Sequence, residues 1–199
     1  MNLSKKLTLV SLLFCLHSVN LTAQRSLRFT DKNSRLKQAV QFTELQDYQQ
    51  AYYLLDDYLT HFRQEPKDKQ EIDYQTALYY YHKCALRLNQ SGAEEKFNRF
   101  LEQTPFTQLK QFGEYELGQY YYDHNRFEEA IKSYERVGIG MLTNKELIKR
   151  NFELGYSYLV TQRLDKVEPY FQSAKNIPGE YFTPGNYYHG VLSYYKKNY

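Results

Sequence analysis

The sequence predicts an all-α protein, a solenoid of about four and a half helix hairpins, and two observations lead to this fold class. Small and aromatic residues recur at similar distances through most of the chain, as expected of hairpins that bury their apolar faces by stacking. Apolar residues follow a helical period, and the tyrosine runs at 79–81 and 120–122 lie within longer helical stretches. No strand is therefore expected.

The clearest unit of this recurrence is Tyr115–Val137. Gly118 and Ala130, twelve residues apart, are expected to let the two helices of a hairpin approach closely. Three aromatic side chains would fill the volume around that contact: Tyr121, Phe127 and Tyr134. The stretch is therefore predicted to be one unit of a stack.

The unit recurs along the chain when its Ala130 is taken as the reference position. The reference positions of the four units are Ala51, Ala93, Ala130 and Val167. Four residues after each stands a large apolar side chain, and we call these the hairpin core positions: Leu55, Phe97, Tyr134 and Phe171. Twelve residues before each stand Ala39, Tyr81, Gly118 and Gly155, so only the second unit breaks the small-residue pattern. The predicted units are about 32–65, 74–107, 111–144 and 148–181, with a partial unit at 183–199.

Helices are predicted over 31–45, 48–62, 69–89, 91–103, 108–123, 127–138, 144–160, 164–175 and 184–197. The breaks between them contain ordinary stop and start signals, among them Thr104-Pro105 and the Pro-Gly pairs at 178–179 and 184–185. Asn144 is expected to cap its helix without the acidic residue that a full capping box requires three positions later.

These residues resemble the tetratricopeptide repeat, a 34-residue helix hairpin with Leu-Gly, Tyr, Ala, Phe and Pro at set places. The third unit matches through Leu117-Gly118, Tyr121, Ala130 and Tyr134, and the fourth through Leu154-Gly155, Tyr158, Phe171, Ala174 and Pro178. The first two units match less completely. The resemblance covers nearly the whole chain after residue 23, and it implies a right-handed superhelix that holds a protein or peptide partner in a concave groove.

In this family the first helix of each hairpin lines the groove, which places nine residues there: Tyr115, Gln119, Tyr122, Lys149, Phe152, Tyr156, Tyr187, Val191 and Tyr194. Such an aromatic groove suits an extended peptide or a helix, because tyrosine combines contact area with a hydroxyl. The alternative for each of these tyrosines is that it packs between repeats and does not contact a partner. One subclass of the family grips a C-terminal carboxylate with Lys, Arg and Asn, but here Lys149 stands almost alone.

Residues 1–23 have the features of an export signal, with two lysines, a short apolar run and Leu-Thr-Ala at 21–23. Cleavage after Ala23 would leave 24–199 as the helical array, in the periplasm or at the cell envelope; an uncleaved anchor is the alternative. The apolar run is too short for a membrane-spanning helix, so no integral span is expected after cleavage. Phe14 before Cys15 argues against a lipoprotein.

The formal net charge is +3, and it falls to +1 when Lys5 and Lys6 leave with the signal. No basic stripe interrupts the remaining chain, so nucleic acid is not an expected partner. Cys84 is the one cysteine beyond residue 23, so no internal disulfide is expected. We predict that it is a buried free thiol.

No catalytic, metal-binding or cofactor-binding constellation is predicted. The histidines at 61, 82, 124 and 189 lack the spacing of a metal site, and His82 and Cys84 lie on different faces of a helix. Adjacent acids such as Glu94-Glu95 and Glu128-Glu129 suit the positive end of a helix dipole. The expected function is a non-enzymatic interaction scaffold, and the alternative is an accessory protein that binds envelope glycans or assists an enzyme.

The last predicted helix has no polar outer face, and Tyr199 stands where the first helix of a hairpin would end. Further repeats, another chain or a second copy of this chain are expected to cover that face. A terminal capping helix that is rich in tyrosine is the alternative.

Overall fold

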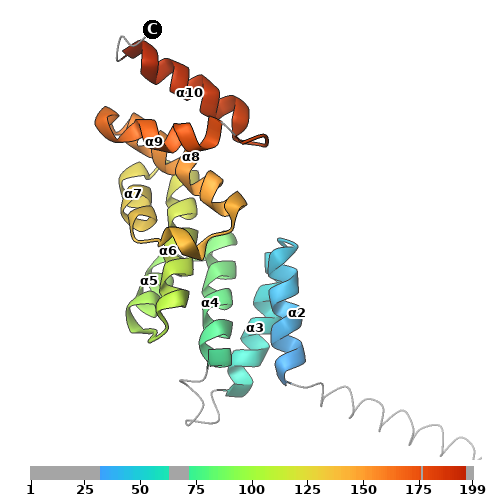
Figure 1. Cartoon of the computed structure of the whole chain (residues 1–199). Coiled ribbons are helices and arrows are strands. Elements are labelled where there is room, and N and C mark those ends of the chain that lie inside the picture. The colour runs from blue at the N-terminus through green and yellow to red at the C-terminus, as the bar shows by residue number, and fades with distance from the viewer. Residues whose placement is uncertain (1–31, 63–71, 176, 196–199) are drawn as a thin grey trace, which may run out of the picture. The chain divides into compact units, whose positions relative to one another are not determined.

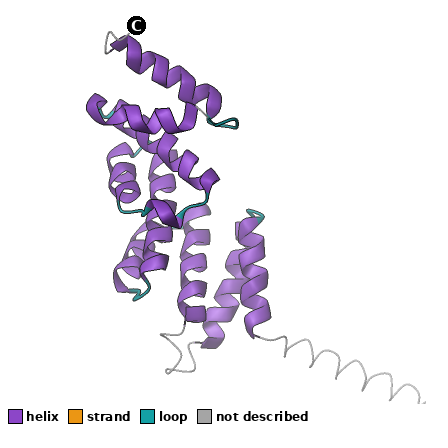
Figure 2. Cartoon of the chain, viewed as in Figure 1, coloured by secondary structure: helices purple, strands orange, loops and turns teal. Residues whose placement is uncertain are grey.

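The computed structural model describes residues 32–62, 72–175 and 177–195 (Figure 1). These residues form nine α-helices and one short 3-10 helix, and they contain no strand (Figure 2). The predicted all-α class is therefore confirmed for the described part of the chain. The predicted export signal at 1–23 lies outside the described residues, and so does Tyr199, at which the last hairpin was predicted to be incomplete.

The helices match the predicted ranges to within three residues at every described end. They are α2 (Lys32–Glu44), α3 (Tyr48–Phe62), α4 (Ile72–Arg87), α5 (Ala93–Gln103), α6 (Thr107–Asp123), α7 (Phe127–Glu135), η1 (Ile139–Met141), α8 (Asn144–Val160), α9 (Leu164–Lys175) and α10 (Phe182–Tyr195). None of the described helices combines the length and apolar composition needed to cross a membrane.

The chain divides into two compact units, residues 1–77 and residues 78–199, and the boundary between them falls within α4. In the first unit, α2 packs against α3, and Ala39, Ala51 and Leu55 are buried. In the second unit, each helix from α5 onward packs against the next in sequence, and α6 also contacts α8 (Figure 1). The first helices of the third and fourth hairpins are therefore neighbours.

The same turn joins the two helices of all four hairpins. Its central residue has a positive φ of 51–61° and is never glycine: Gln46, Asn89, Asn125 and Gln162. In each turn the central N–H donates to the carbonyl three residues back, and the next N–H donates to the carbonyl five residues back, at 2.8–3.1 Å. This Schellman pattern satisfies carbonyls at the end of the first helix. Glycine usually marks such a turn, so these four turns could not be predicted from the sequence pattern.

Each hairpin buries the positions that the recurrence predicts. The alanine and valine reference positions are at most 4% exposed, and all four hairpin core positions are 0% exposed. Complete burial of a side chain of this size contributes about 1.5–3 kcal/mol. The hairpin core positions therefore make a substantial contribution to holding each helix pair together.

Gly118 faces the ring of Tyr134, which comes from the opposite helix of the same hairpin. A Cβ atom built on Gly118 would lie 2.5 Å from that ring, closer than Cβ contacts in proteins allow. Gly118 was predicted to let the two helices approach closely, and the structure shows that the space at Gly118 is filled by this side-chain ring. Gly155 occupies the same place in the fourth hairpin, where a Cβ atom would lie 2.9 Å from Cβ of Tyr170 and 3.3 Å from the ring of Phe171.

The second hairpin has Tyr81 at the small position, and its core is built differently. The ring of Phe97 lies 6.0 Å from the ring of His82 and nearly parallel to it, at 22°. Nδ1 of His82 is buried and has no hydrogen-bond partner among the described residues. Burial lowers the pKa of His82 to about 4, and the positive charge of Lys96 acts in the same direction.

The capping of α8 and the position of Pro184 differ from the prediction. Thr143, not Asn144, caps α8: its hydroxyl accepts from the N–H of Glu146 at 3.3 Å, and its own N–H donates to the Glu146 carboxylate at 2.8 Å. This is a full capping box, which was missed because the cap was placed one residue late. Pro184 does not precede the last helix but lies in the first turn of α10, where a missing N–H costs no helical hydrogen bond.

Gly118→Ala is expected to destabilise the chain, although alanine in a helix is ordinarily favoured over glycine by about 1 kcal/mol. The added methyl group would overlap the Tyr134 ring, and overpacking costs about 1–3 kcal/mol. Gly190→Ala is the matched control, because Gly190 also lies in a helix but has open space at its Cβ position. Urea unfolding should give a lower midpoint for the first variant and an equal or higher one for the second. A raised midpoint for Gly118→Ala would contradict the packing.

Protonation of His82 is expected to destabilise the fold below neutral pH. Because its pKa is lower in the folded chain, the unfolded chain takes up the proton first, and the free energy of unfolding decreases as pH falls from 6.5 toward about 4. The complete shift corresponds to about 3 kcal/mol. His82→Asn cannot take up this proton, so its urea midpoint should depend less on pH. Equal slopes for the two proteins would exclude this role of His82.

Candidate partner-binding cleft

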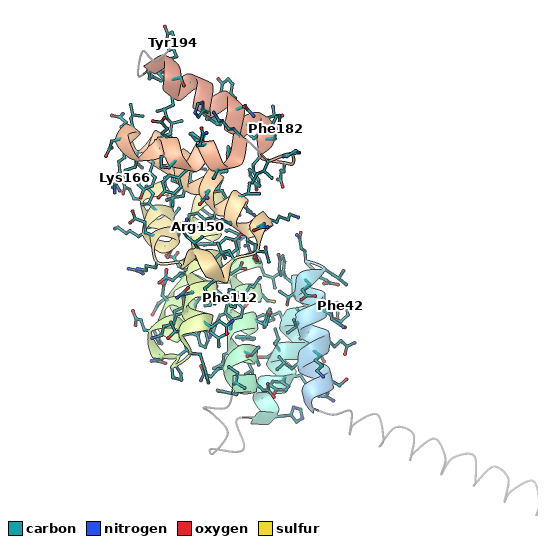
Figure 3. All side chains as sticks on the ribbon, in the orientation of Figure 1. Phe42, Phe112, Arg150, Lys166, Phe182 and Tyr194 are labelled. Carbon is teal, nitrogen blue, oxygen red and sulfur yellow. The ribbon has the colours of Figure 1, made fainter. Side chains whose placement is uncertain are left out.

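The nine residues predicted to line a groove lie at different depths in the structure. Three are buried: Tyr115, Gln119 and Phe152. Four are half-buried: Tyr122, Lys149, Tyr156 and Val191. Two are 64% and 71% exposed: Tyr187 and Tyr194, the second near the outer end of α10 (Figure 3). They do not form one continuous surface.

Three of the nine line a single cleft of about 590 Å³: Tyr122, Phe152 and Tyr156. Four further apolar or aromatic side chains complete its walls: Phe127, Tyr181, Pro184 and Tyr188. The polar lining residues are Asp123, Asn125 and Glu180. The cleft thus combines side chains of α6, α7, α8 and α10 with the turn after α6 and the segment before α10.

The turn at Asn125 brings the lining residues of α6 and α7 together. Tyr122 and Asp123 end α6, and the N–H of Asn125 donates to the Tyr122 carbonyl at 3.0 Å. The chain then reverses, and Phe127 begins α7 with its ring 5.9 Å from that of Tyr122. A local backbone pattern therefore sets one wall of the cleft.

Tyr156 is the centre of the aromatic walls. Its ring lies 5.8 Å from Tyr122 and 5.7 Å from Phe127, at interplanar angles of 74° and 66°. The ring of Tyr188 on α10 lies 5.3 Å away at 73°. Edge-to-face pairs of this kind each contribute about 0.5–1.5 kcal/mol beyond their buried area. The rings therefore hold one another in place.

Phe152 connects the cleft to the core of the fourth hairpin. Its ring lies 5.8 Å from the ring of Phe171, a hairpin core position, and 5.0 Å from the ring of Tyr181. The Phe171 ring in turn stacks on Tyr188 at 5.5 Å and 19°. The back wall of the cleft is thus continuous with the core.

A buried ion network joins α4 to α6. The Glu116 carboxylate, 6% exposed, lies 2.6 Å from Nζ of Lys83 and 2.7 Å from Nη2 of Arg87. Burial alone would raise the pKa of Glu116, but these two cations outweigh it and hold the pKa below its ordinary value. Nη1 of Arg87 also lies 3.5 Å from the Asp123 carboxylate, which links the network to the cleft.

The side chain of Gln119 extends this network from α6 to α8. Its Oε1 accepts hydrogen bonds from Arg87 at 2.6 Å and from Lys149 at 3.2 Å. Nζ of Lys149 lies 3.7 Å from the carboxylate of Glu153, which accepts a hydrogen bond from the Tyr134 hydroxyl. Burial raises the pKa of Glu153 to about 7. Lys149, which stood almost alone in the sequence, is therefore part of a network across three helices.

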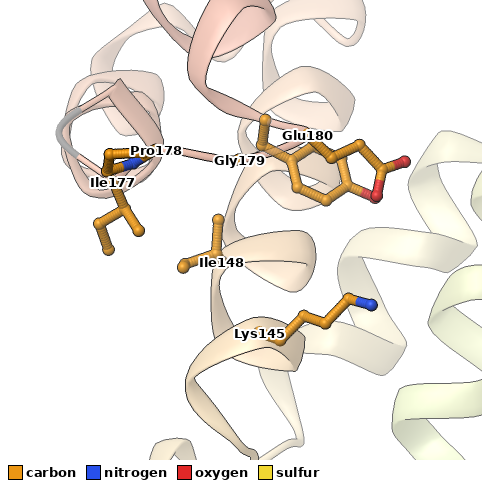
Figure 4. A pocket seen from close by; sticks show the side chains of 7 residues that line it. Lys145, Ile148, Ile177, Pro178, Gly179 and Glu180 are labelled. Atoms are coloured by element: carbon orange, nitrogen blue, oxygen red, sulfur yellow. The ribbon is translucent and has the colours of Figure 1, made fainter.

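A smaller pocket of about 300 Å³ adjoins the cleft, since Glu180 and Tyr181 line both. Figure 4 shows Ile148 of α8 and Ile177 of the segment after α9 beside this space, with Lys145 at its edge. The pocket is mainly apolar and has one basic and one acidic side chain in its lining.

Seven of the ten lining residues were not predicted from the sequence, and four of these lie outside the first helices: Asn125, Phe127, Glu180 and Tyr181. Asp123 and Asn125 belong to the end of α6 and the turn after it, and Glu180 precedes α10. On α10 the structure places Tyr188 in the cleft, whereas Tyr187 was predicted to line the groove. Neighbouring residues differ by about 100° around a helix, so a shift of one residue changes the face. The Pro-Gly pair at 184–185 was the sequence feature closest to the lining residues that precede and begin α10.

The cleft offers contact area, hydroxyl groups and two carboxylates. Its lining contains no histidine, cysteine or serine. Among the described residues, no three His, Cys, Asp or Glu side chains form a group that could hold a metal ion. Cys84 is completely buried, as predicted, and it is not part of a disulfide within the described residues.

Comparison of the chain with protein-family models found no matching family. Searches of curated proteins and of solved structures likewise found no match. The cleft, the charges around it and the repeated hairpins are therefore the observations on which a function rests.

Glu116→Gln is expected to lower the free energy of unfolding by about 3 kcal/mol, because Lys83 and Arg87 lose their buried anion. Glu95→Gln is the matched control. Glu95 is 75% exposed and pairs with Arg99 on the surface of α5, and such pairs contribute about 1 kcal/mol at most. Urea unfolding of both variants measures the difference. An equal loss in the two variants would show that the buried network does not stabilise the fold.

Proposed function

We propose that this protein is a non-enzymatic interaction scaffold that binds an extended peptide segment of a partner protein in the cleft. The cleft itself is the observation that supports this most: its walls are mainly aromatic rings that fix one another. Its volume of about 590 Å³ lies within the range of about 300–1,000 Å³ that is usual for preformed binding sites. Such a cleft takes a few side chains of an extended segment.

The hairpins are proposed to form a right-handed solenoid of the tetratricopeptide type. The same turn at four hairpins, the buried hairpin core positions and the contact between α6 and α8 support this arrangement. In solenoids of this kind, side chains of successive first helices share one surface. The cleft fits that expectation, because it combines residues of α6, α8 and α10.

The scaffold is proposed to work after export, in the periplasm or at the cell envelope. The lysines, apolar run and Leu-Thr-Ala sequence of residues 1–23 support this location. The described fold is compatible with an oxidising compartment, because its one cysteine, Cys84, is buried.

A glycan-binding or enzyme-associated accessory role is the second candidate, and one observation favours it. Asp123, Asn125 and Glu180 lie beside the rings of the cleft, where they can bind sugar hydroxyls. Stacking on a sugar uses an open, flat ring face, whereas the rings that contact Tyr156 stand at 66–74° to its ring. Peptide binding is therefore the better supported of the two.

Selection of a random peptide library on the full chain tests the proposal. Selected peptides should bind the Tyr156→Ala variant at least about tenfold more weakly, because the rings around Tyr156 lose their central contact. Tyr53→Ala is the control, since Tyr53 is 69% exposed on α3 and far along the chain from the cleft residues. Thermal unfolding of Tyr156→Ala shows whether the variant is folded.

A second variant, Glu180→Trp, fills the cleft from an exposed lining position and leaves its rings in place. Peptides that bind both cleft variants as tightly as the original chain would show that the cleft is not the binding site. Retention of envelope oligosaccharides, with no peptide selected, would favour the glycan alternative instead.

A further inference from the structure

We propose that the cleft recognises a lysine side chain of the bound peptide, with the ammonium group among the aromatic rings and between Asp123 and Glu180. This inference rests on the proposed function and names the chemistry of the partner. Three features of the cleft lead to it: the charges of its lining, the helix end beside it and the geometry of its rings.

The charged residues that line the cleft are acidic. Asp123 and Glu180 belong to the lining, and no lysine, arginine or histidine does. Glu180 is exposed and has no ion pair with any residue that the structure describes. The Asp123 side chain is 53% exposed, and its partner Arg87 at 3.5 Å lies closer to Glu116, at 2.7 Å. A cation entering the cleft is therefore attracted, and a carboxylate is repelled.

The end of α6 adds to this negative potential. α6 ends at Asp123, and the turn at Asn125 follows directly. The aligned peptide dipoles of a helix give its C-terminus about half a negative charge, which favours cations within the last turn. The helix end and both carboxylates therefore favour the same sign of charge.

The aromatic walls have room for a cation from outside the chain. The two cation–ring contacts among the described residues involve Tyr121 and Tyr158, and neither ring lines the cleft. The three rings that contact Tyr156 stand at 66–74° to its ring, so these four side chains do not share one flat face. A cation over a ring face gains about 0.5–2 kcal/mol, more where water is excluded. The geometry suits a compact ammonium better than a planar guanidinium, which stacks along one open face.

The surrounding basic residues do not occupy this position. Nζ of Lys149 is held by Gln119 and Glu153 outside the lining of the cleft. Lys145 lines only the adjoining pocket, where the aliphatic residues Ile148 and Ile177 lie. A peptide with a lysine in the cleft and an apolar side chain in the adjoining pocket would therefore match both sites.

Two small probes separate charge from apolar contact: N-acetyl-lysine methylamide and its norleucine analogue, which has the same four side-chain carbons but no ammonium group. Each is titrated into the full chain, and the tyrosine ring resonances of the cleft are followed by nuclear magnetic resonance. The lysine probe is expected to bind about tenfold more tightly than the norleucine probe. The double variant Asp123→Asn, Glu180→Gln should reduce this preference to about twofold or less. Glu102→Gln, an exposed acid on α5, is the matched control and should retain the preference.

Equal or tighter binding of the norleucine probe would overturn the lysine inference, although the cleft would remain a peptide site. A lysine preference that persists in the double variant would also overturn it, because the ammonium group would then be recognised by groups other than these two carboxylates. Absence of binding by both probes would overturn it as well. The peptide selection with Tyr156→Ala tests the proposed function separately, since it does not depend on the charge of the peptide.

Discussion

One large side chain buried at the crossing of each hairpin is the constraint on which the rest of the structure depends. In the third hairpin Tyr134 occupies the space that Gly118 leaves, and in the fourth Phe171 packs against Gly155. The second hairpin has no small residue at this point, and Phe97 packs against a histidine ring instead. The hairpin core residue is therefore completely buried in each case, although it packs against different residues. This explains why a large side chain recurs at the hairpin core position more strictly than a small residue recurs opposite it.

The same buried side chains position the cleft. Phe171 is a hairpin core position, yet its ring also contacts Phe152 and Tyr188, which line the cleft. Tyr134 is completely buried, and its hydroxyl donates to Glu153 on the next helix. The walls of the cleft are thus anchored in the cores of two neighbouring hairpins. A binding surface built in this way is preorganised, so little ordering of its side chains has to accompany binding.

The sequence was sufficient to predict the helices and the buried positions, because both follow from periodicity. It was not sufficient to predict contacts between hairpins, since periodicity indicates which face of a helix is buried but not which other helix packs against that face. Lys149 shows the difference: its partner Gln119 lies thirty residues earlier and on another helix. The cleft depends further on a turn at Asn125 that has no glycine, and on the segment before α10. Such features are set by tertiary packing and have no fixed spacing in the chain.

The high tyrosine content has a physical reason in the way neighbouring helices are joined. Three hydroxyls donate to acids on adjacent helices: Tyr121 to Glu94, Tyr134 to Glu153 and Tyr158 to Glu135. Each tyrosine therefore supplies buried ring area and also satisfies a carboxylate, which phenylalanine would leave with one partner fewer. Within the hairpins, acids are thus engaged by hydroxyls and by cations such as Arg126. The carboxylate of Glu180 has no ion pair with the described residues and lies in the lining of the cleft, where a group from outside the chain can reach it.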